Sequence, residues 1–183
     1  MNTYISMIRG INVSGQKKIK MDELRKMYED IGFKKVTSYI QSGNVLFEDK
    51  SKNQNELAKR IEKKISEHFG YDVSLFVLTP DELKSIRKLN PFVKRKDVDV
   101  RRLYVSILLN KPDSALVEKL IVVNFEPDEF VINDKTIYLY CPVSYGNSKL
   151  SNNYFENKLK VIATTRNWNT VNELIRLADD SLK

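Results

Sequence analysis

The order of strand-like and helix-like segments constrains this chain most. Within the first eighty residues, four segments have strand character: Thr3–Arg9, Lys35–Ile40, Asn44–Glu48 and Val73–Leu78. Apolar residues at helical spacing predict one helix over Met21–Ile31 and another that begins after Ser51 and ends at Gly70. The order is therefore βαββαβ. It predicts a ferredoxin-like lobe, in which helices pack on one face of an antiparallel sheet.

A second and less regular copy of the same order follows. Strands are predicted at Leu103–Leu109, Glu129–Ile132, Thr136–Cys141 and Ile162–Thr165. Helices are predicted after Pro112, near Ser148–Leu159 and at the end over Asn169–Ala178. We therefore expect an α+β fold of two ferredoxin-like lobes, with residues 1–79 in the first lobe. A short helix and a basic linker occupy 80–102, and 103–183 form the second lobe with an extra C-terminal helix.

The positive charge is concentrated in one segment. The net charge is +7, and the stretch from Lys84 to Arg102 holds eight Lys and Arg residues against Asp97 and Asp99. A basic cluster of this kind is typical of proteins that bind nucleic acid or another phosphate-bearing anion. The alternative is a solvated linker with no partner.

Composition excludes several classes of site. With Cys141 and His68 as the one cysteine and the one histidine, neither an internal disulfide nor a Cys/His zinc site can form, and we expect no metal or cofactor. The longest apolar runs are far shorter than the ~20 residues that cross a bilayer, so we expect a cytoplasmic protein without a membrane partner. No catalytic constellation is recognisable, which favours a binding protein over an enzyme.

The polar corner between the second and third strands is the first candidate site. It contains Gln41, Ser42 and Asn44, with Gly43 able to supply a positive φ. Compared with an RNA-recognition strand, Ser42 and Asn44 stand where stacking rings would be needed, so the corner is no base-stacking platform. Two interpretations stay open: the amides of Gln41 and Asn44 latch the hairpin to the neighbouring Arg9 loop, or they contact a ligand.

The loop from Gly10 to Lys18 is the second candidate. It lies where a phosphate loop would lie, but its lysine comes one residue late and no Ser or Thr follows it. A weaker anion cradle remains open, made of the Gly10–Gly15 backbone with Arg9, Lys17 or Lys18. Asn12 in the same loop is a further candidate for ligand binding. The alternative is a flexible connector.

The third candidate is the turn before the last helix. Arg166 can receive a phosphate or carboxylate beside Trp168, or it can bridge the two halves through carbonyl oxygens. Asn167 can be a simple helix cap. Our hypothesis is that the Arg9 loop, the corner and this turn converge on one cleft between the lobes. That cleft would hold nucleic acid or a phosphorylated small molecule. An enzyme that clamps a small anionic substrate with Arg9 or Arg166 is the alternative.

Three tyrosines give a further alternative. Tyr138 and Tyr140 share one face of a predicted strand, and Tyr104 is expected to point the same way from its neighbour. Such a face could stack bases or form the interface of a homo-oligomeric module. The expected oligomeric state is accordingly a monomer or a weak homodimer.

Several motifs together resemble a known family. Arg9-Gly10-Ile11-Asn12-Val13, Tyr39-Ile40-Gln41-Ser42-Gly43-Asn44-Val45 and Thr165-Arg166-Asn167-Trp168-Asn169-Thr170-Val171 resemble a bacterial family catalogued as domain of unknown function 1697. One departure is Ser14, where the family would be expected to have glycine. The resemblance implies ferredoxin-like α+β lobes in cytosolic bacterial proteins, and it implies no activity and no cofactor.

Overall fold

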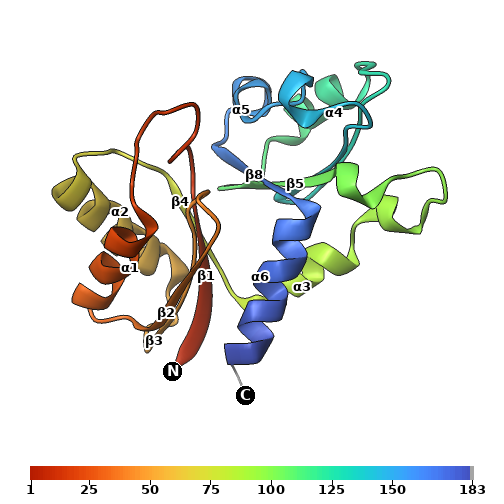
Figure 1. Cartoon of the computed structure of the whole chain (residues 1–183). Coiled ribbons are helices and arrows are strands. Elements are labelled where there is room, and N and C mark those ends of the chain that lie inside the picture. The colour runs from red at the N-terminus through yellow and green to blue at the C-terminus, as the bar shows by residue number, and fades with distance from the viewer. Residues whose placement is uncertain (182–183) are drawn as a thin grey trace. The chain divides into compact units, whose positions relative to one another are not determined.

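The computed structural model describes residues 1–181 and divides the chain into two compact units (Figure 1). Unit 1 comprises residues 1–84 together with 173–183, and unit 2 comprises 85–172. This division differs from the expected domains in two respects. The segment 85–102 belongs to unit 2 rather than to a linker, and the end of the last helix belongs to unit 1 rather than to the second lobe.

Unit 1 contains the first βαββαβ sequence. In chain order its elements are β1 (Asn2–Ile8), α1 (Met21–Asp30), β2 (Lys34–Tyr39), β3 (Asn44–Asp49), α2 (Gln54–Phe69) and β4 (Leu75–Leu78). All neighbouring strands are antiparallel, in the sheet order β2-β3-β1-β4. Both α1 and α2 lie on one face of this sheet (Figure 1). The ferredoxin-like prediction is confirmed for this unit.

Unit 2 repeats the topology. Its elements are β5 (Leu103–Leu108), α4 (Ser114–Ile121), β6 (Glu129–Asn133), β7 (Thr136–Tyr140), α5 (Asn152–Leu159) and β8 (Ala163–Asn167). The sheet order β6-β7-β5-β8 is the equivalent of the order in unit 1, and all its pairs are antiparallel. The prediction of a second copy is therefore also confirmed.

Five further elements lie outside the two repeats. They are α3 (Pro80–Lys88), the 3₁₀ turns η1 (Pro91–Lys94), η2 (Val100–Arg102) and η3 (Tyr145–Asn147), and α6 (Trp168–Ser181). Thr79 and Glu82 begin α3 with a reciprocal capping box, because each backbone N–H donates to the other side chain. The unit boundaries fall within α3 and within α6.

The core of unit 1 is built around aromatic rings. Phe47 on β3 has its ring centroid 4.3 Å from Phe33, 5.6 Å from Tyr28 and 5.7 Å from Tyr4. The buried Tyr28 hydroxyl pairs with Ser6 Oγ at 2.9 Å, and burial raises the pKa of this phenol. The ring cluster joins α1 to the sheet, since Tyr28 comes from α1 and Phe47 from β3.

The core of unit 2 lies between its sheet and α4 and α5. Leu108 and Leu139 contribute from the sheet, Cys141 from the residue directly after β7, and Phe155 from α5. Burial raises the pKa of the Cys141 thiol to about 11, so this cysteine is protonated near neutral pH and is a poor nucleophile.

We predict that Phe47→Ala lowers the free energy of unfolding of unit 1 by about 3–5 kcal/mol, because it removes a fully buried ring and leaves a cavity. Phe47→Leu is the matched variant, and it keeps much of the buried volume. Amide hydrogen exchange in β1 and β3 measures both losses within unit 1. A loss for Phe47→Ala no larger than that for Phe47→Leu would contradict the central place of this ring.

Candidate functional site

The corner between β2 and β3 is tightly packed around Gly43. This residue has φ +72°, and a Cβ at this position would lie 2.8 Å from Ile11 Cδ1 and 3.0 Å from Ile8 Cβ. The backbone also approaches β1 here, because the Ile8 N–H donates to the Gly43 carbonyl at 2.9 Å. Glycine is therefore required both by the backbone conformation and by the close approach of β1.

Asn44 is an internal support of the corner. It is fully buried, and its Nδ2 donates to Ser42 Oγ at 2.8 Å and to the Tyr39 carbonyl at 3.3 Å. These two bonds connect Asn44 to the end of β2 and to the middle of the turn. A buried amide that donates to a hydroxyl and to a backbone carbonyl of the turn stabilises the corner and leaves little of the side chain for a ligand.

Asn12 ties the first loop to this corner. Its Oδ1 accepts from the Ile19 N–H at 2.8 Å, while its Nδ2 donates at 2.9 Å to the carbonyls of both Ile19 and Gln41. A tie between the first loop and the corner thus exists, in which the amide belongs to Asn12 and Gln41 contributes its backbone carbonyl while its side chain is exposed. A tie from the Asn44 amide to the Arg9 loop stays a prediction.

The first loop is a small hairpin rather than a flexible connector. Val13 and Gln16 form an antiparallel bridge, and Ser14 and Gly15 between them have φ +49° and +75°, as a type I′ turn requires. The Gln16 N–H donates to the Val13 carbonyl at 2.9 Å, and Lys17 Nζ donates to the Asp72 carbonyl. The loop backbone therefore largely pairs with itself, which weakens the anion-cradle interpretation.

The turn before α6 lies in unit 2. Arg166 on β8 is buried, and its Nη1 donates to Thr164 Oγ1 at 2.8 Å and to the Thr165 carbonyl at 2.9 Å. Burial lowers the pKa of Arg166 to about 10, so the guanidinium remains charged at neutral pH. Asn167 Oδ1 accepts from the Asn169 N–H at 2.8 Å, which is a capping contact at the start of α6, beside the buried Trp168.

The candidate residues thus fall into two groups. Arg9, Asn12, Lys17, Gln41, Ser42 and Asn44 belong to unit 1, whereas Arg166, Asn167 and Trp168 belong to unit 2. Within unit 1, Asn12 joins the first loop to the corner directly. The convergence of both groups on one cleft stays a prediction.

The prediction that Tyr104, Tyr138 and Tyr140 share one face of the sheet is wrong. Tyr104 pairs with Leu139, and Tyr138 pairs with Val105, so Tyr104 points to the opposite side of the sheet from Tyr138 and Tyr140. Tyr104 stacks on Tyr145 with centroids 4.6 Å apart, on the side of the helices. Tyr138 is 1% exposed and its hydroxyl donates to the Ile86 carbonyl at 3.0 Å, so its ring offers no free stacking surface.

In unit 2 the basic segment covers the face of the sheet to which Tyr138 and Tyr140 point. The Tyr138 hydroxyl contacts α3 through Ile86, and the Phe92 ring of η1 lies 6.3 Å from the Tyr140 ring. The Cys141 N–H donates to the Arg102 carbonyl at 3.0 Å, which fixes the end of the segment beside β7. The expected linker is therefore an ordered part of unit 2.

Comparison with known proteins identifies the family. The model of DUF1697, a protein family of unknown function, matches residues 1–138. The chain belongs to the DUF1697 family. Among solved structures, it is similar to the conserved bacterial protein SP0830 from Streptococcus pneumoniae, with 22% sequence identity and a TM-score of 0.74. The alignment covers 96% of this chain and 98% of that one, and at this identity it shows the fold. No curated protein matches the chain.

Membership of the DUF1697 family, together with the solved structure, indicates the fold. Any binding or catalytic chemistry has to be inferred from the side chains. Within residues 1–181, no group of His, Cys, Asp and Glu side chains could hold a metal ion. Over the same residues, no helix combines the length and the apolar character that crossing a membrane requires. Ser14, where glycine was expected, lies in the tip of the first hairpin, and its φ of +49° is strained for a residue other than glycine.

Two groups of residues in this DUF1697 protein were not among the candidate sites that the sequence predicts. The cations Arg87, Lys88, Lys94, Lys96 and Arg102 were recognised as charge, but their display on an ordered surface was not predicted. Lys35 and Glu48, which line a pocket in unit 1, gave no local signal. They meet through a β-bulge between Lys34 and Thr37, and no spacing rule reveals such an irregularity.

We predict that Asn12→Ala destabilises unit 1 by about 1–3 kcal/mol, because three hydrogen bonds of its amide are lost and the two backbone partners on Ile19 stay partly buried. Gln41→Ala is the control, and we expect a change within about 0.5 kcal/mol because only the Gln41 carbonyl takes part. Chemical denaturation of both variants measures this contrast. Equal losses would show that Asn12 is not the latch.

Proposed function

We propose that this protein binds nucleic acid through exposed cations of residues 87–102 in unit 2. The observation that carries the proposal is the charge distribution within that unit. Residues 85–102 contain seven Lys and Arg residues against two Asp residues, whereas residues 103–172 contain seven basic and seven acidic residues. The whole positive excess of unit 2 therefore lies in this one segment.

Only some of these cations are neutralised by neighbours. Arg95 pairs with Asp97 at 2.5 Å and with Glu129 at 2.6 Å, and Arg101 pairs with Asp99 at 2.9 Å. These carboxylates hold the pKa of Arg95 and Arg101 above the usual value. Five exposed cations form no ion pair within 4 Å of a carboxylate among residues 1–181: Arg87, Lys88, Lys94, Lys96 and Arg102. Such cations gain most from a polyanion, since each phosphate contact releases counterions.

The backbone that carries them is already ordered. Asn90 Oδ1 caps η1 by accepting from the Phe92 N–H at 3.0 Å, and the Arg102 N–H donates to the Asp99 carbonyl at 2.9 Å. An ordered backbone loses less conformational entropy on binding than a flexible basic linker would. This supports a binding surface over a solvated connector.

An extended polyanion suits this arrangement better than a single phosphate group. The five cations come from the last turn of α3, from η1 and the residue that follows Arg95, and from η2. Cations spread over three successive elements can contact several phosphates of one strand. A phosphorylated small molecule would need them to converge on one point.

We predict that the triple variant Lys88→Glu, Lys94→Glu, Lys96→Glu binds single-stranded RNA and DNA at least about tenfold more weakly than wild type at low salt. The matched control is Lys119→Glu, Lys135→Glu, Lys149→Glu, which changes the net charge of unit 2 by the same amount at three exposed lysines outside the segment. Fluorescence anisotropy over a series of salt concentrations measures both. The slope of log K against log salt should fall by about 2 for the segment variant, and less for the control.

Two outcomes would contradict the proposal. The first is absence of wild-type binding to RNA or DNA at low salt. The second is an equal loss in the two triple variants, which would mean that net charge alone, and not this segment, attracts the polyanion. Duplex DNA and anionic lipid vesicles serve as comparison ligands, and a preference for the vesicles would replace nucleic acid by a membrane surface.

A further inference from the structure

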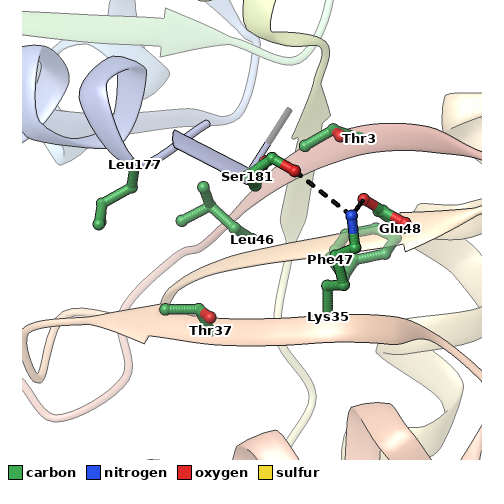
Figure 2. Close-up of a pocket in the computed structure, with 8 residues that line it drawn as sticks. All are labelled: Thr3, Lys35, Thr37, Leu46, Phe47, Glu48, Leu177 and Ser181. Carbon is green, nitrogen blue, oxygen red and sulfur yellow. Dashed lines mark hydrogen bonds and ion pairs between the residues drawn. The ribbon is translucent and has the colours of Figure 1, made fainter. Parts of the chain in front are cut away.

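Unit 1 contains a small pocket that is separate from the surface described above. Its volume is about 190 Å³, below the roughly 300 Å³ at which sites for drug-sized ligands begin. It opens on the face of the sheet opposite α1 and α2, between β1, β2 and β3 and the last turns of α6 (Figure 2). The lining residues all belong to unit 1: Thr3, Lys35, Thr37, Leu46, Phe47, Glu48, Leu177 and Ser181.

A distortion of β2 directs a cation into this pocket. The pairing of β2 with β3 shifts between Lys34 and Thr37, and Lys35 within this bulge has φ +47°. Bulges re-aim side chains and are common beside functional sites, and a positive φ is strained for lysine. As a result, Lys35 Nζ lies 2.9 Å from Glu48 Oε1 (Figure 2).

The two partners of this ion pair differ in mobility. The Glu48 side chain is 12% exposed and fixed in the sheet, whereas the Lys35 side chain is 61% exposed on a flexible stem. Glu48 therefore offers a fixed carboxylate to a cationic group. Lys35 can move to another anion without leaving the pocket, since its side chain retains most of its freedom in water.

The end of α6 adds negative character at the same place. The Ser181 carbonyl accepts from Lys35 Nζ at 3.3 Å, and the C-terminal end of a helix carries a partial negative charge. A group that replaces the Lys35 ammonium beside Glu48 must consequently be a cation. The apolar side chains of Leu46 and Leu177 line the remaining wall, with the Thr3 and Thr37 hydroxyls nearby (Figure 2).

We propose that this pocket binds a small zwitterion, such as a free α-amino acid with an apolar side chain. The ligand ammonium takes the place of Lys35 on Glu48, and the released Lys35 ammonium pairs with the ligand carboxylate. One ion pair is exchanged for two, so no charge in the pocket is left without a partner. The apolar side chain of the ligand contacts Leu46 and Leu177. This site is independent of the nucleic-acid surface in unit 2.

The test is a thermal-shift and calorimetric screen of the full chain with the individual standard amino acids at millimolar concentration. We expect an apolar amino acid to raise the melting temperature by mass action. The matching amine without a carboxylate and the matching acid without an ammonium should each raise it much less, because each completes only one of the two ion pairs. Binding that is as strong for either half-ligand as for the zwitterion would overturn the proposal.

Two lysine variants locate the effect. Lys35→Ala should weaken amino-acid binding by about tenfold or more, since it removes the partner of the ligand carboxylate. Lys34→Ala is the matched control at the neighbouring exposed lysine, which does not line the pocket, and it should bind as the wild type does. Both lysines are exposed, so neither variant should unfold the protein. Equal binding in Lys35→Ala and wild type, or no binding of any standard amino acid, would overturn the proposal.

Discussion

The second face of each four-stranded sheet is the constraint on which the rest of this structure depends. In a ferredoxin-like unit the two helices cover one face, and the other must be polar or be covered by additional chain. Here the other face carries apolar side chains in both units, such as Ile5 and Met7 in unit 1 and Val105 and Tyr138 in unit 2, and all four are buried. The elements outside the repeats meet this requirement where their contacts are defined. Leu177 of α6 lines the same pocket as Leu46 of β3, and α3 reaches Tyr138 through the Ile86 carbonyl.

The need to cover the second face of each sheet helps to distinguish residues that hold the fold from residues that are available to a partner. Sequence motifs alone do not make this distinction. Of the most distinctive polar residues, Asn12 ties the first loop to the corner, and Asn44 supports the corner from within. The less distinctive basic segment is held against the sheet of unit 2, and its free cations point to a partner. A β-bulge in the edge strand of unit 1 places Lys35 against Glu48 and creates the small pocket. In this protein the most distinctive motifs thus stabilise the local backbone. The two proposed binding sites lie instead at a segment of exposed charge and at an irregularity in a strand.

Much of the fold could be predicted because it follows from local patterns. The helix over Met21–Ile31, the capping box at Thr79 and the two βαββαβ orders all rest on spacing within one segment. The predictions that failed concern the pairing of segments that are distant in the sequence. Tyr104 faces away from Tyr138 because of the register of β5 with β7, and a shift by one residue would reverse it. Since both faces of this sheet are apolar, the sequence pattern could not select the register. The β-bulge at Lys35 and the burial of Arg166 likewise depend on contacts distant in sequence.

We expect the ordered segment 87–102 to contact a polyanion while the first loop and the corner maintain the fold. A titration of isotope-labelled protein with a short single-stranded oligonucleotide, followed by backbone amide chemical shifts, tests this directly. We predict that the largest shifts occur between Arg87 and Arg102, that they diminish as salt is added, and that residues 10–18 and 41–44 change little. Largest shifts in the first loop and the corner would contradict it.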